Sequence, residues 1–318
     1  MLYGFAVTPK IARILFSFHP LFLLLVDKIP LILIPMTKDI YTIRQMTEEE
    51  IPLAVEWAAR EGWNPGLYDA SCFYAADPTG FLIGELDGKM VACKSAVKYG
   101  DDFGFMGFYM VAPKYRGKGY GYEIWKRGHD SLVGRVSGMD GVVEQQPNYR
   151  KSGYRLAYRN IRMEGKATGM RVENVHLIPA SEVSFDSLVD YDRQYFPAER
   201  SKFLECWIQQ PESLALTYVE KGSIVGFGMI RKCRIGYKIG PLFSESENIA
   251  NFLSGTLFGF PHEGEPVFLD IPEPNEAAQR LAECYKMKKV FETARMYYGP
   301  PPVQNIGHVY GITTFELG

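Results

Sequence analysis

The stretch VAPKYRGKGYG at residues 111–121 joins a predicted strand to the start of a predicted helix. Its glycines, at positions 117, 119 and 121, allow unusual backbone angles and let a ligand approach the main chain closely. Successive N–H groups can then point into one cavity, where the helix dipole adds about half a positive charge. Arg116 and Lys118 add further positive charge. The stretch therefore predicts a binding site for a phosphate or pyrophosphate group.

Two common phosphate-binding motifs do not fit this loop. A P-loop needs GxxxxGK followed by Ser or Thr, which the loop lacks. A dinucleotide fingerprint needs GxGxxG, and counting from Gly117 places its last glycine at Tyr122. The preceding strand also follows an antiparallel hairpin instead of opening a βαβ unit. Neither motif therefore describes the site.

Upstream of the loop, the pattern predicts an antiparallel meander. Asp87-Gly88 is a strong two-residue hairpin signal, and Pro113 ends the last strand because proline has no N–H for the ladder. Ahead of the meander, Thr47 and Glu50 form a predicted capping box for a helix that runs to Arg60. Strands are expected at 81–86, 90–99, 103–111, 141–145 and 154–162, and a helix at 122–132.

The second half of the chain repeats this order of elements. GELDGKMVACKSA, beginning at Gly84, corresponds to TYVEKGSIVGFGM, beginning at Thr217. The period of about 130 residues indicates a tandem duplication and not a short-period solenoid. We predict an α+β fold of two tandem units, each a mostly antiparallel twisted sheet flanked by helices. The expected parts are an apolar extension at 1–38, a first domain at 39–172 and a degenerate second domain at 173–318.

Composition excludes some functions. Lys and Arg total 35 against 37 Asp and Glu, so the formal net charge is -2 and no global positive field would attract nucleic acid. The five cysteines are widely spaced and contain no CxxC. We therefore expect neither a disulfide framework nor a zinc site. A reducing, cytoplasmic compartment fits this use of cysteine best.

Before Met36 the sequence becomes strongly apolar. Asp27-Lys28 separates two apolar runs, and neither run alone has the ~20 residues of a membrane-spanning helix. The favoured interpretation is an appendage outside the fold, with translation starting at Met36. Two alternatives stay open: a targeting segment or anchor that contacts a membrane through residues 14–35, and a packed N-terminal element.

The loop and its surroundings resemble the GNAT acetyltransferase superfamily. RGKGYG at 116–121 fits that family's Q/R-x-x-G-x-G/A pyrophosphate loop at every fixed position, and YMV at 109–111 is similar to its splayed strand. YRKSGY at 149–154 looks like the family's Y-x-x-x-G-F segment, with Tyr in place of Phe. The resemblance covers residues 41 to about 165. Residues 175–318 are similar to the extra C-terminal domain of tandem bacterial acetyltransferases, the YitH-like group.

This resemblance implies one acyl-CoA site, in the first half of the chain. The second half has SESEN at 244–248 in place of the glycine-rich loop, and its two carboxylates would repel a pyrophosphate. The expected cofactor is acetyl-CoA as co-substrate, without a metal. The residues implied to bind it are Tyr109, Met110, Val111, Arg116, Gly117, Lys118, Gly119, Tyr120 and Gly121.

The resemblance also implies transfer of an acetyl group to the primary amine of a small-molecule or amino-acid-like acceptor. The protonated amine must lose a proton, an N–H such as that of Val111 would stabilise the carbonyl oxygen, and the leaving thiolate needs a proton. Tyr149 matches the family's general-acid position. The strand 103–111 carries no carboxylate, where the family often places its base. Glu144, on the next predicted strand, is the candidate base; a water chain or an already neutral amine would serve instead.

Two alternative functions stay open. The missing strand carboxylate favours a non-catalytic acyl-CoA-binding sensor, and a third interpretation is an acyltransferase with another acyl chain or a hydroxyl acceptor. Cys93 is interpreted as a buried structural thiol. The resemblance to the GNAT superfamily also suggests residues for the acceptor pocket. A core ion pair explains Arg231 and Asp270 equally well. These candidates are Arg231, Asp270, Arg295 and the segment 192–200.

Overall fold

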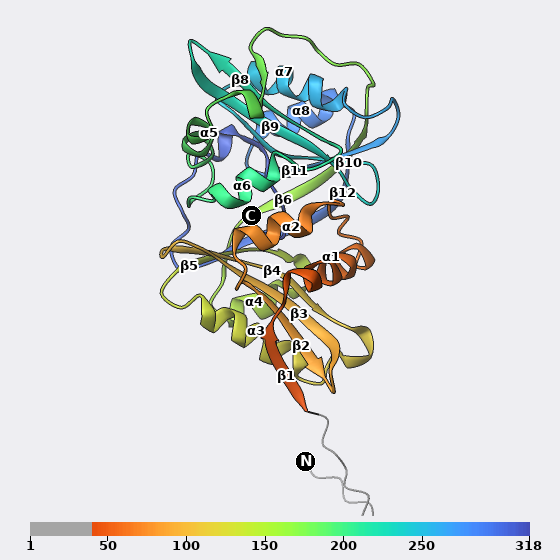
Figure 1. Cartoon of the computed structure of the whole chain (residues 1–318), viewed down its shortest axis with the longest axis vertical. Helices are drawn as coiled ribbons and strands as arrows, with labels where there is room; N and C mark the ends of the chain where they lie inside the picture. Colours follow the sequence, from red (N-terminus) through yellow and green to blue (C-terminus); the bar gives the residue numbers. More distant parts are fainter. Residues whose placement is uncertain (1–39) are drawn as a thin grey trace, which may run out of the picture. The chain divides into compact units, whose positions relative to one another are not determined.

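The computed structural model describes residues 40–318, which form one compact unit. The predictions for residues 1–38, including the start at Met36 and membrane contact through residues 14–35, lie outside the described residues. Residues 40–318 are built on a single sheet of 13 strands with helices around it (Figure 1). Within them, no helix is both long and apolar enough to cross a membrane.

In the first half, the glycine-rich loop lies between β4 (Phe103–Val111) and α3 (Tyr120–Ser131), as predicted. Thr47 and Glu50 form the predicted capping box. Helix α2 is not among the predicted elements because its apolar residues do not gather on one face. The other elements are β1 (Tyr41–Gln45), α1 (Ile51–Arg60), α2 (Asp69–Ala76), β2 (Phe81–Leu86), β3 (Lys89–Tyr99), β5 (Val136–Val142), α4 (Gln146–Lys151) and β6 (Arg155–Lys166).

The second half follows the same order, as the internal repeat predicts. Ser246 caps α7 by accepting a hydrogen bond from the N–H of Ile249, and Asn275 caps α8 in the same way. The elements are β7 (Leu177–Pro179), α5 (Phe185–Asp192), α6 (Ser201–Trp207), β8 (Ser213–Glu220), β9 (Ser223–Lys232), β10 (Tyr237–Ser244), α7 (Glu247–Phe258), β11 (Pro266–Pro272), α8 (Glu276–Cys284), β12 (Lys288–Tyr298) and β13 (Val309–Gly311).

The two halves exchange their last strands. The sheet order is β1-β2-β3-β4-β5-β12-β6-β11-β10-β9-β8-β7, and β13 pairs with β10. Strand β12 from the second half therefore lies beside β5, while β6 from the first half lies beside β11. Only the neighbours β4–β5 and β10–β11 are parallel in this described sheet, which confirms the predicted, mostly antiparallel arrangement. The sheet continues across the exchange, and the boundary at residue 172 stays a prediction.

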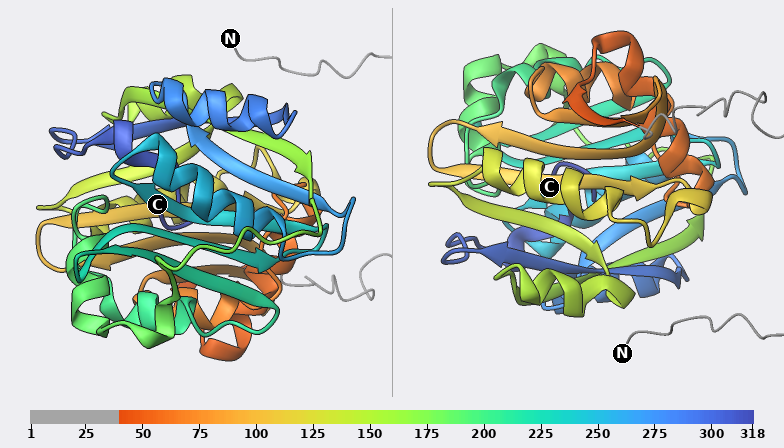
Figure 2. Two further views of the ribbon diagram at one scale, coloured as in Figure 1. Left: turned by 90° about the horizontal axis from the view of Figure 1, so that it is seen from above. Right: turned by 90° about the horizontal axis from the view of Figure 1, so that it is seen from below.

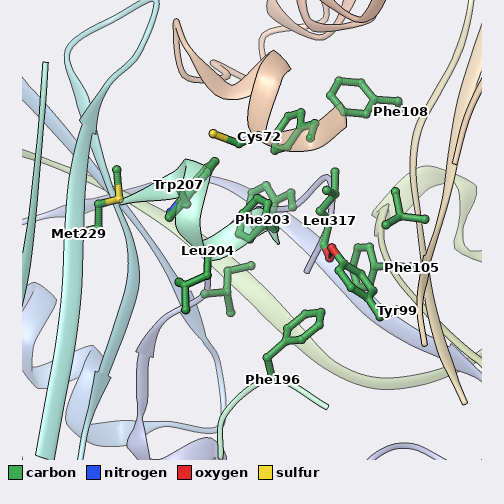
Figure 3. Close-up of a cluster of buried hydrophobic side chains, with 14 of the residues drawn as sticks. Cys72, Tyr99, Phe105, Phe108, Phe196, Phe203, Leu204, Trp207, Met229 and Leu317 are labelled. Carbon is green, nitrogen blue, oxygen red and sulfur yellow. Dashed lines mark hydrogen bonds between the residues drawn. The ribbon is translucent and has the colours of Figure 1, made fainter. Parts of the chain in front are cut away.

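The core between the halves is shared by both of them. Helix α2 packs against α1 and α6, and the ring of Phe73 lies 6.2 Å from that of Trp207. The end of the chain, residues 312–318, is buried in this region (Figures 1 and 2). Leu317 lies among the aromatic side chains of both halves (Figure 3), and the Tyr99 hydroxyl donates a hydrogen bond of 3.2 Å to its carbonyl oxygen.

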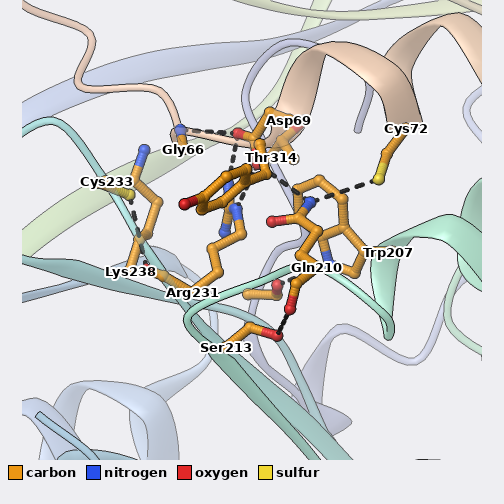
Figure 4. A network of polar contacts seen from close by, with 12 residues as sticks. Gly66, Asp69, Cys72, Trp207, Gln210, Ser213, Arg231, Cys233, Lys238 and Thr314 are labelled. Atoms are coloured by element: carbon orange, nitrogen blue, oxygen red, sulfur yellow. Dashed lines mark hydrogen bonds and ion pairs between the residues drawn. The ribbon is translucent and has the colours of Figure 1, made fainter.

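The residues suggested for an acceptor pocket are all bound in buried ion pairs. Arg231 pairs with Asp69 at 2.8 Å (Figure 4), so two distant parts of the chain meet there. The ion-pair interpretation of Arg231 and Asp270 is confirmed, although they do not pair with each other. The other buried pairs are Arg162–Asp270, Arg200–Asp192 and Arg295–Asp140, each at 2.7 Å.

The structure contains a disulfide, where the sequence analysis expected no disulfide framework. Cys72 of α2 and Cys206 of α6 form a disulfide across a sequence separation of 134 residues. Their partnership depends on the packing of α2 against α6, which the spacing of cysteines does not reveal. Cys93 is a buried free thiol, as interpreted, and its Sγ donates to the carbonyl oxygen of Phe108 at 3.4 Å.

Candidate functional site

Strands β4 and β5 separate at the centre of the sheet. Their parallel pairing ends at Met106 and Met139. Two residues later, Phe108 has a positive φ of 45°, which is unusual for a bulky side chain. The pairing of β3 with β4 shifts register between Cys93 and Ser95. This bulge bends β4 away from β5, so the strands diverge toward the glycine-rich loop.

The glycine-rich loop presents its main chain to open space. Gly117 and Gly119 have φ values of 75° and 94°, which favour glycine. A Cβ atom on either would meet no described atom within 4 Å. Gly119 is also the N-cap of the 12-residue helix α3 and supplies no side chain to its first N–H groups. This loop therefore fits the predicted anion site.

Arg116 ties the loop to its surroundings. Its Nε donates to the carbonyl oxygen of Val111 at 2.8 Å, and its Nη2 donates to the Glu61 carboxylate at 2.5 Å. The side chain is 52% exposed, so the guanidinium is also open to an incoming anion. The contact with Val111 fixes the loop to the end of β4.

An open groove of about 540 Å³ runs along the diverging end of β4. Lys118 and Tyr120 are not among its lining residues: Lys118 lies over the ring of Tyr115, and Tyr120 packs on Tyr41. The structure brings the other predicted cofactor residues together in its wall. These are Tyr109, Met110, Val111, Arg116, Gly117, Gly119 and Gly121.

Tyr149 stands at the inner end of this groove. It belongs to α4, is buried, and its ring stacks on that of Trp125 at 5.3 Å. Burial raises the pKa of its phenol, and the nearby Tyr109 and Glu144 raise it further. The hydroxyl therefore stays protonated and can act as a proton donor at neutral pH.

Glu144 does not lie where the sequence places it. Strand β5 ends at Val142, and Glu144 falls in a 3₁₀ turn (Val143–Gln145) that leads into α4. The proline at the start of that helix favours a turn there over a continued strand. Glu144 is exposed and lines neither this groove nor the cavity behind Tyr149. Its role as a base stays a prediction without support from this position.

A smaller cavity of about 50 Å³ lies behind Tyr149. Gly107 and Tyr109 of β4 form one wall, and Asp140 and Val142 of β5 form another. The cavity shares Tyr109, Tyr149, Val142 and Trp63 with the outer groove, so the two spaces adjoin. Its remaining wall comes from the second half of the chain, through β12 and the C-terminal tail, residues 312–318.

Lys94 is a functional candidate that the sequence analysis did not find. Its Nζ lies 4.9 Å from the centre of the Trp125 ring and donates to the carbonyl oxygens of Ser95 and Gly107 at 3.1 and 3.2 Å. Burial lowers the pKa of this amine to about 7. The contact with Gly107 holds the main chain at the point where β4 leaves β5.

Glu316 is the second candidate that the sequence analysis missed. The side chain lines the inner cavity and is 2% exposed. Burial raises the pKa of its carboxyl, against the opposing effect of Lys238 and Arg162. Glu316 is far from Tyr149 along the chain, so no local motif links the two residues. Only the folded chain brings it to the site.

The corresponding place in the second half is differently built. Ser246 fills the N-terminus of α7 with its own side chain, and Glu247 pairs with Arg280 at 2.8 Å. These features leave no open amides of the kind found at Gly119. Within residues 40–318, no three His, Cys, Asp or Glu side chains are grouped to hold a metal ion.

Both halves of the chain match GNAT sequence families. Residues 40–145 match the family described as "Acetyltransferase (GNAT) family", and residues 188–311 match "Acetyltransferase (GNAT) domain". Together the two matches span more than half of the chain. The chain therefore belongs to the GNAT superfamily, as a tandem protein with two GNAT domains.

Individual relatives agree with this assignment. The chain is 29% identical over 280 residues to holothin acyltransferase from Pseudoalteromonas sp. (strain SANK 73390), covering 87% of this chain and 95% of that protein. A putative acetyltransferase from Pyrococcus horikoshii has a similar fold, with a TM-score of 0.74, 20% identity and coverage of 87% and 96%. A tandem GNAT protein from the clavulanic acid biosynthesis pathway has a TM-score of 0.55 and 11% identity, with coverage of 82% and 100%. GNAT enzymes are acyltransferases that use an acyl-CoA as co-substrate.

Proposed function

We propose that this protein is an N-acetyltransferase that moves an acetyl group from acetyl-CoA to the primary amine of a small-molecule or amino-acid-like acceptor. One observation carries the proposal. The open amides of the glycine-rich loop, the diverging end of β4 and the Tyr149 side chain lie along one groove. A pyrophosphate, an extended chain and a reacting thioester would need these features in this order.

The first half supplies the groups that would hold the donor. The main-chain amides around Gly117 and Gly119 and the N-terminus of α3 would bind the pyrophosphate, with Arg116 adding charge. The exposed edge of β4 at Tyr109–Val111 would pair with the pantetheine amides. Gly117 and Gly119 leave the space that a bound phosphate needs, since a Cβ at either would occupy open groove.

Acetyl-CoA would supply the reactive thioester. The N–H of Val111, at the end of β4, would stabilise a developing negative charge on the carbonyl oxygen. The buried, protonated Tyr149 would give its proton to the departing thiolate. The acceptor amine must first lose a proton, because an alkylamine is almost fully charged at pH 7.

Calorimetry with coenzyme A and thiol release from acetyl-CoA over a library of amines test the proposal. We expect binding to wild type and to Tyr149→Phe alike, with turnover by Tyr149→Phe reduced by about 100-fold. Tyr68→Phe, which changes an exposed tyrosine hydroxyl bonded to Glu212, is the matched control. Absence of any coenzyme A binding contradicts the proposal.

Two alternative functions predict other outcomes. Binding without turnover by any amine would identify a sensor. Faster turnover of a longer acyl-CoA, or of a hydroxyl acceptor, would identify a different acyltransferase. The 29% identical relative is named an acyltransferase and its name does not specify an acyl chain. The comparison of acetyl-CoA with longer thioesters is therefore part of the same experiment.

A further inference from the structure

Two buried polar groups in the inner cavity have no partner. The Oε1 atom of Glu316 and the Oγ1 atom of Thr293 are buried, and neither forms a hydrogen bond with any residue in 40–318. Their side chains are 2% exposed, and both line the cavity behind Tyr149. Buried polar groups in native proteins are almost always satisfied. Two such groups in one cavity therefore point to a ligand that donates hydrogen bonds.

The position of Glu316 is fixed by the C-terminal tail. The Thr314 hydroxyl accepts hydrogen bonds from the N–H groups of Glu316 and Leu317, at 3.2 and 2.9 Å. The backbone of Glu316 also lies directly against Gly107, where a Cβ atom would overlap its carbonyl oxygen. The tail therefore holds the Glu316 carboxylate beside the point where β4 and β5 diverge.

The charges around Glu316 are already balanced apart from one lysine. Arg162 and Arg231 face it but are each bound to an aspartate, Asp270 and Asp69. Lys238 also faces it, yet its Nζ donates to the carbonyl oxygen of Asn64 at 2.9 Å. Burial lowers the pKa of Lys238 and raises that of Glu316. Lys238 is thus the one cation facing Glu316 that no other carboxylate pairs with, and within the described chain Glu316 forms no ion pair with it.

From this geometry we infer that the inner cavity is the acceptor site, that Glu316 binds the acceptor ammonium and takes its proton, and that Thr293 accepts a second hydrogen bond from it. The inference rests on the proposed function. Two further ionisable side chains line the cavity: Asp140 is bound to Arg295, and Lys94 donates to main-chain carbonyl oxygens. The apolar part of the wall includes Trp63, Phe291 and Phe315. The acceptor class is therefore a small primary amine with an apolar body, of a size that a cavity of about 50 Å³ can hold.

The step balances with the groups named. One proton of the ammonium passes to the Glu316 carboxylate, and the nitrogen lone pair forms the bond to the acyl carbonyl carbon. The carbon–sulfur bond breaks, and the thiolate takes the proton of Tyr149. The nitrogen then loses its second surplus proton, and this proton returns through solvent to the Tyr149 phenolate. Glu316 releases its own proton to solvent and becomes a carboxylate again. Ammonium and thioester thus give amide, thiol and one proton.

The decisive pair of probes is ethylamine and 2,2,2-trifluoroethylamine, with acetyl-CoA as donor. The first is protonated at pH 7 and needs a base, whereas the second is largely neutral because fluorine lowers its basicity. For Glu316→Gln we expect kcat/KM to fall by about 100-fold with ethylamine and by less than about 10-fold with trifluoroethylamine. Thr293→Val is expected to raise KM for both amines with a smaller change in kcat.

Controls separate chemistry from folding. Glu316→Gln keeps the shape of the side chain, and its affinity for coenzyme A by calorimetry should stay within twofold of wild type. Glu316→Asp keeps the charge and should retain more activity than the amide variant if the carboxylate is the base. Glu263→Gln changes an exposed carboxylate that lines neither the cavity nor the groove, and it should leave every value unchanged.

The results that overturn the inference differ from those that overturn the proposed function. If coenzyme A binds wild type but neither of these two amines reacts, the acceptor class is wrong. An equal loss for both amines in Glu316→Gln contradicts the base role. A loss that appears in Glu144→Gln instead of Glu316→Gln assigns the base to Glu144. A failure to bind coenzyme A removes the proposed function itself.

Discussion

The Nζ atom of Lys94 lies 3.2 Å from the carbonyl oxygen of Gly107, the first residue of β4 beyond its pairing with β5. A buried amine on the neighbouring strand β3 thus supports the main chain where the groove begins. Such a carbonyl would otherwise have to find another donor at the point where the ladder ends. The same amine also donates to Ser95, so it joins the two strands across the bulge.

The titration of Lys94 should appear in the stability of the protein. Burial lowers its pKa from 10.5 to about 7 in the folded state. Between pH 7 and 10 the unfolded chain then binds more protons at this position than the folded one, so the free energy of unfolding rises with pH. The free energies of unfolding of wild type and Lys94→Met should be measured by urea denaturation at several pH values. Their difference should shift by a few kcal/mol in favour of wild type between pH 7 and 10. A pH-independent difference contradicts the shifted pKa.

Reversal of the charge at Arg116 should weaken coenzyme A binding. In Arg116→Glu the new carboxylate would lie beside Glu61 and face the predicted pyrophosphate, where both charges oppose an anion. We expect the Kd for coenzyme A to rise by about 10- to 100-fold. Arg127→Glu, on the exposed side of α3, makes the same charge change and should have little effect. Equal affinities of the two variants for coenzyme A would exclude Arg116 from the site.

Substitution of Gly107 tests the contact between β4 and the tail. A Cβ atom in Gly107→Ala would overlap the carbonyl oxygen of Glu316. The overlapping atom belongs to the backbone, which cannot move aside as the end of a flexible side chain can. We expect unfolding to become easier by about 1–3 kcal/mol. In Gly307→Ala the new Cβ atom has an ordinary contact at 3.5 Å, so its stability should change by less than about 0.5 kcal/mol. Similar urea midpoints for both variants would show that the C-terminal tail does not lie against Gly107.

The disulfide between Cys72 and Cys206 predicts a count of thiols. The sequence has five cysteines, and Cys93, Cys233 and Cys284 are free. Titration of the denatured, unreduced protein should detect these three, and reduction should expose the other two. Reduction should also lower stability by about 2–4 kcal/mol, and Cys206→Ala should make the urea midpoint insensitive to reductant. Five thiols without reduction would show that α2 and α6 pack without this bond.

The glycine-rich loop and most elements could be predicted because their signals are local. A capping box at Thr47, a hairpin at Asp87-Gly88 and a positive φ at Gly119 each depend on a few neighbouring residues. The internal repeat extended these predictions to the second half. Most of the loop residues lie along one groove because they follow one another within a single strand–loop–helix unit, whereas Tyr149 reaches this groove from α4, after β5.

Glu144 marks the point where local pattern was insufficient. The apolar residues of β5 continue to Val143, so the sequence does not show that the strand ends at Val142. The sequence pattern therefore places Glu144 on that strand. The carboxylate that faces the cavity is Glu316, which reaches it through the tail of the other half.

The sequence by itself determined the kind of loop, the order of elements and the duplication, since these depend on backbone angles, turns and periodicity within short segments. The tertiary structure alone decided the exchange of β6 and β12, the disulfide between α2 and α6, and the meeting of Lys94, Thr293 and Glu316 around one site. Such contacts join segments far apart in the chain. Their partners are selected by the packing of the whole sheet, and no short stretch of residues encodes that choice.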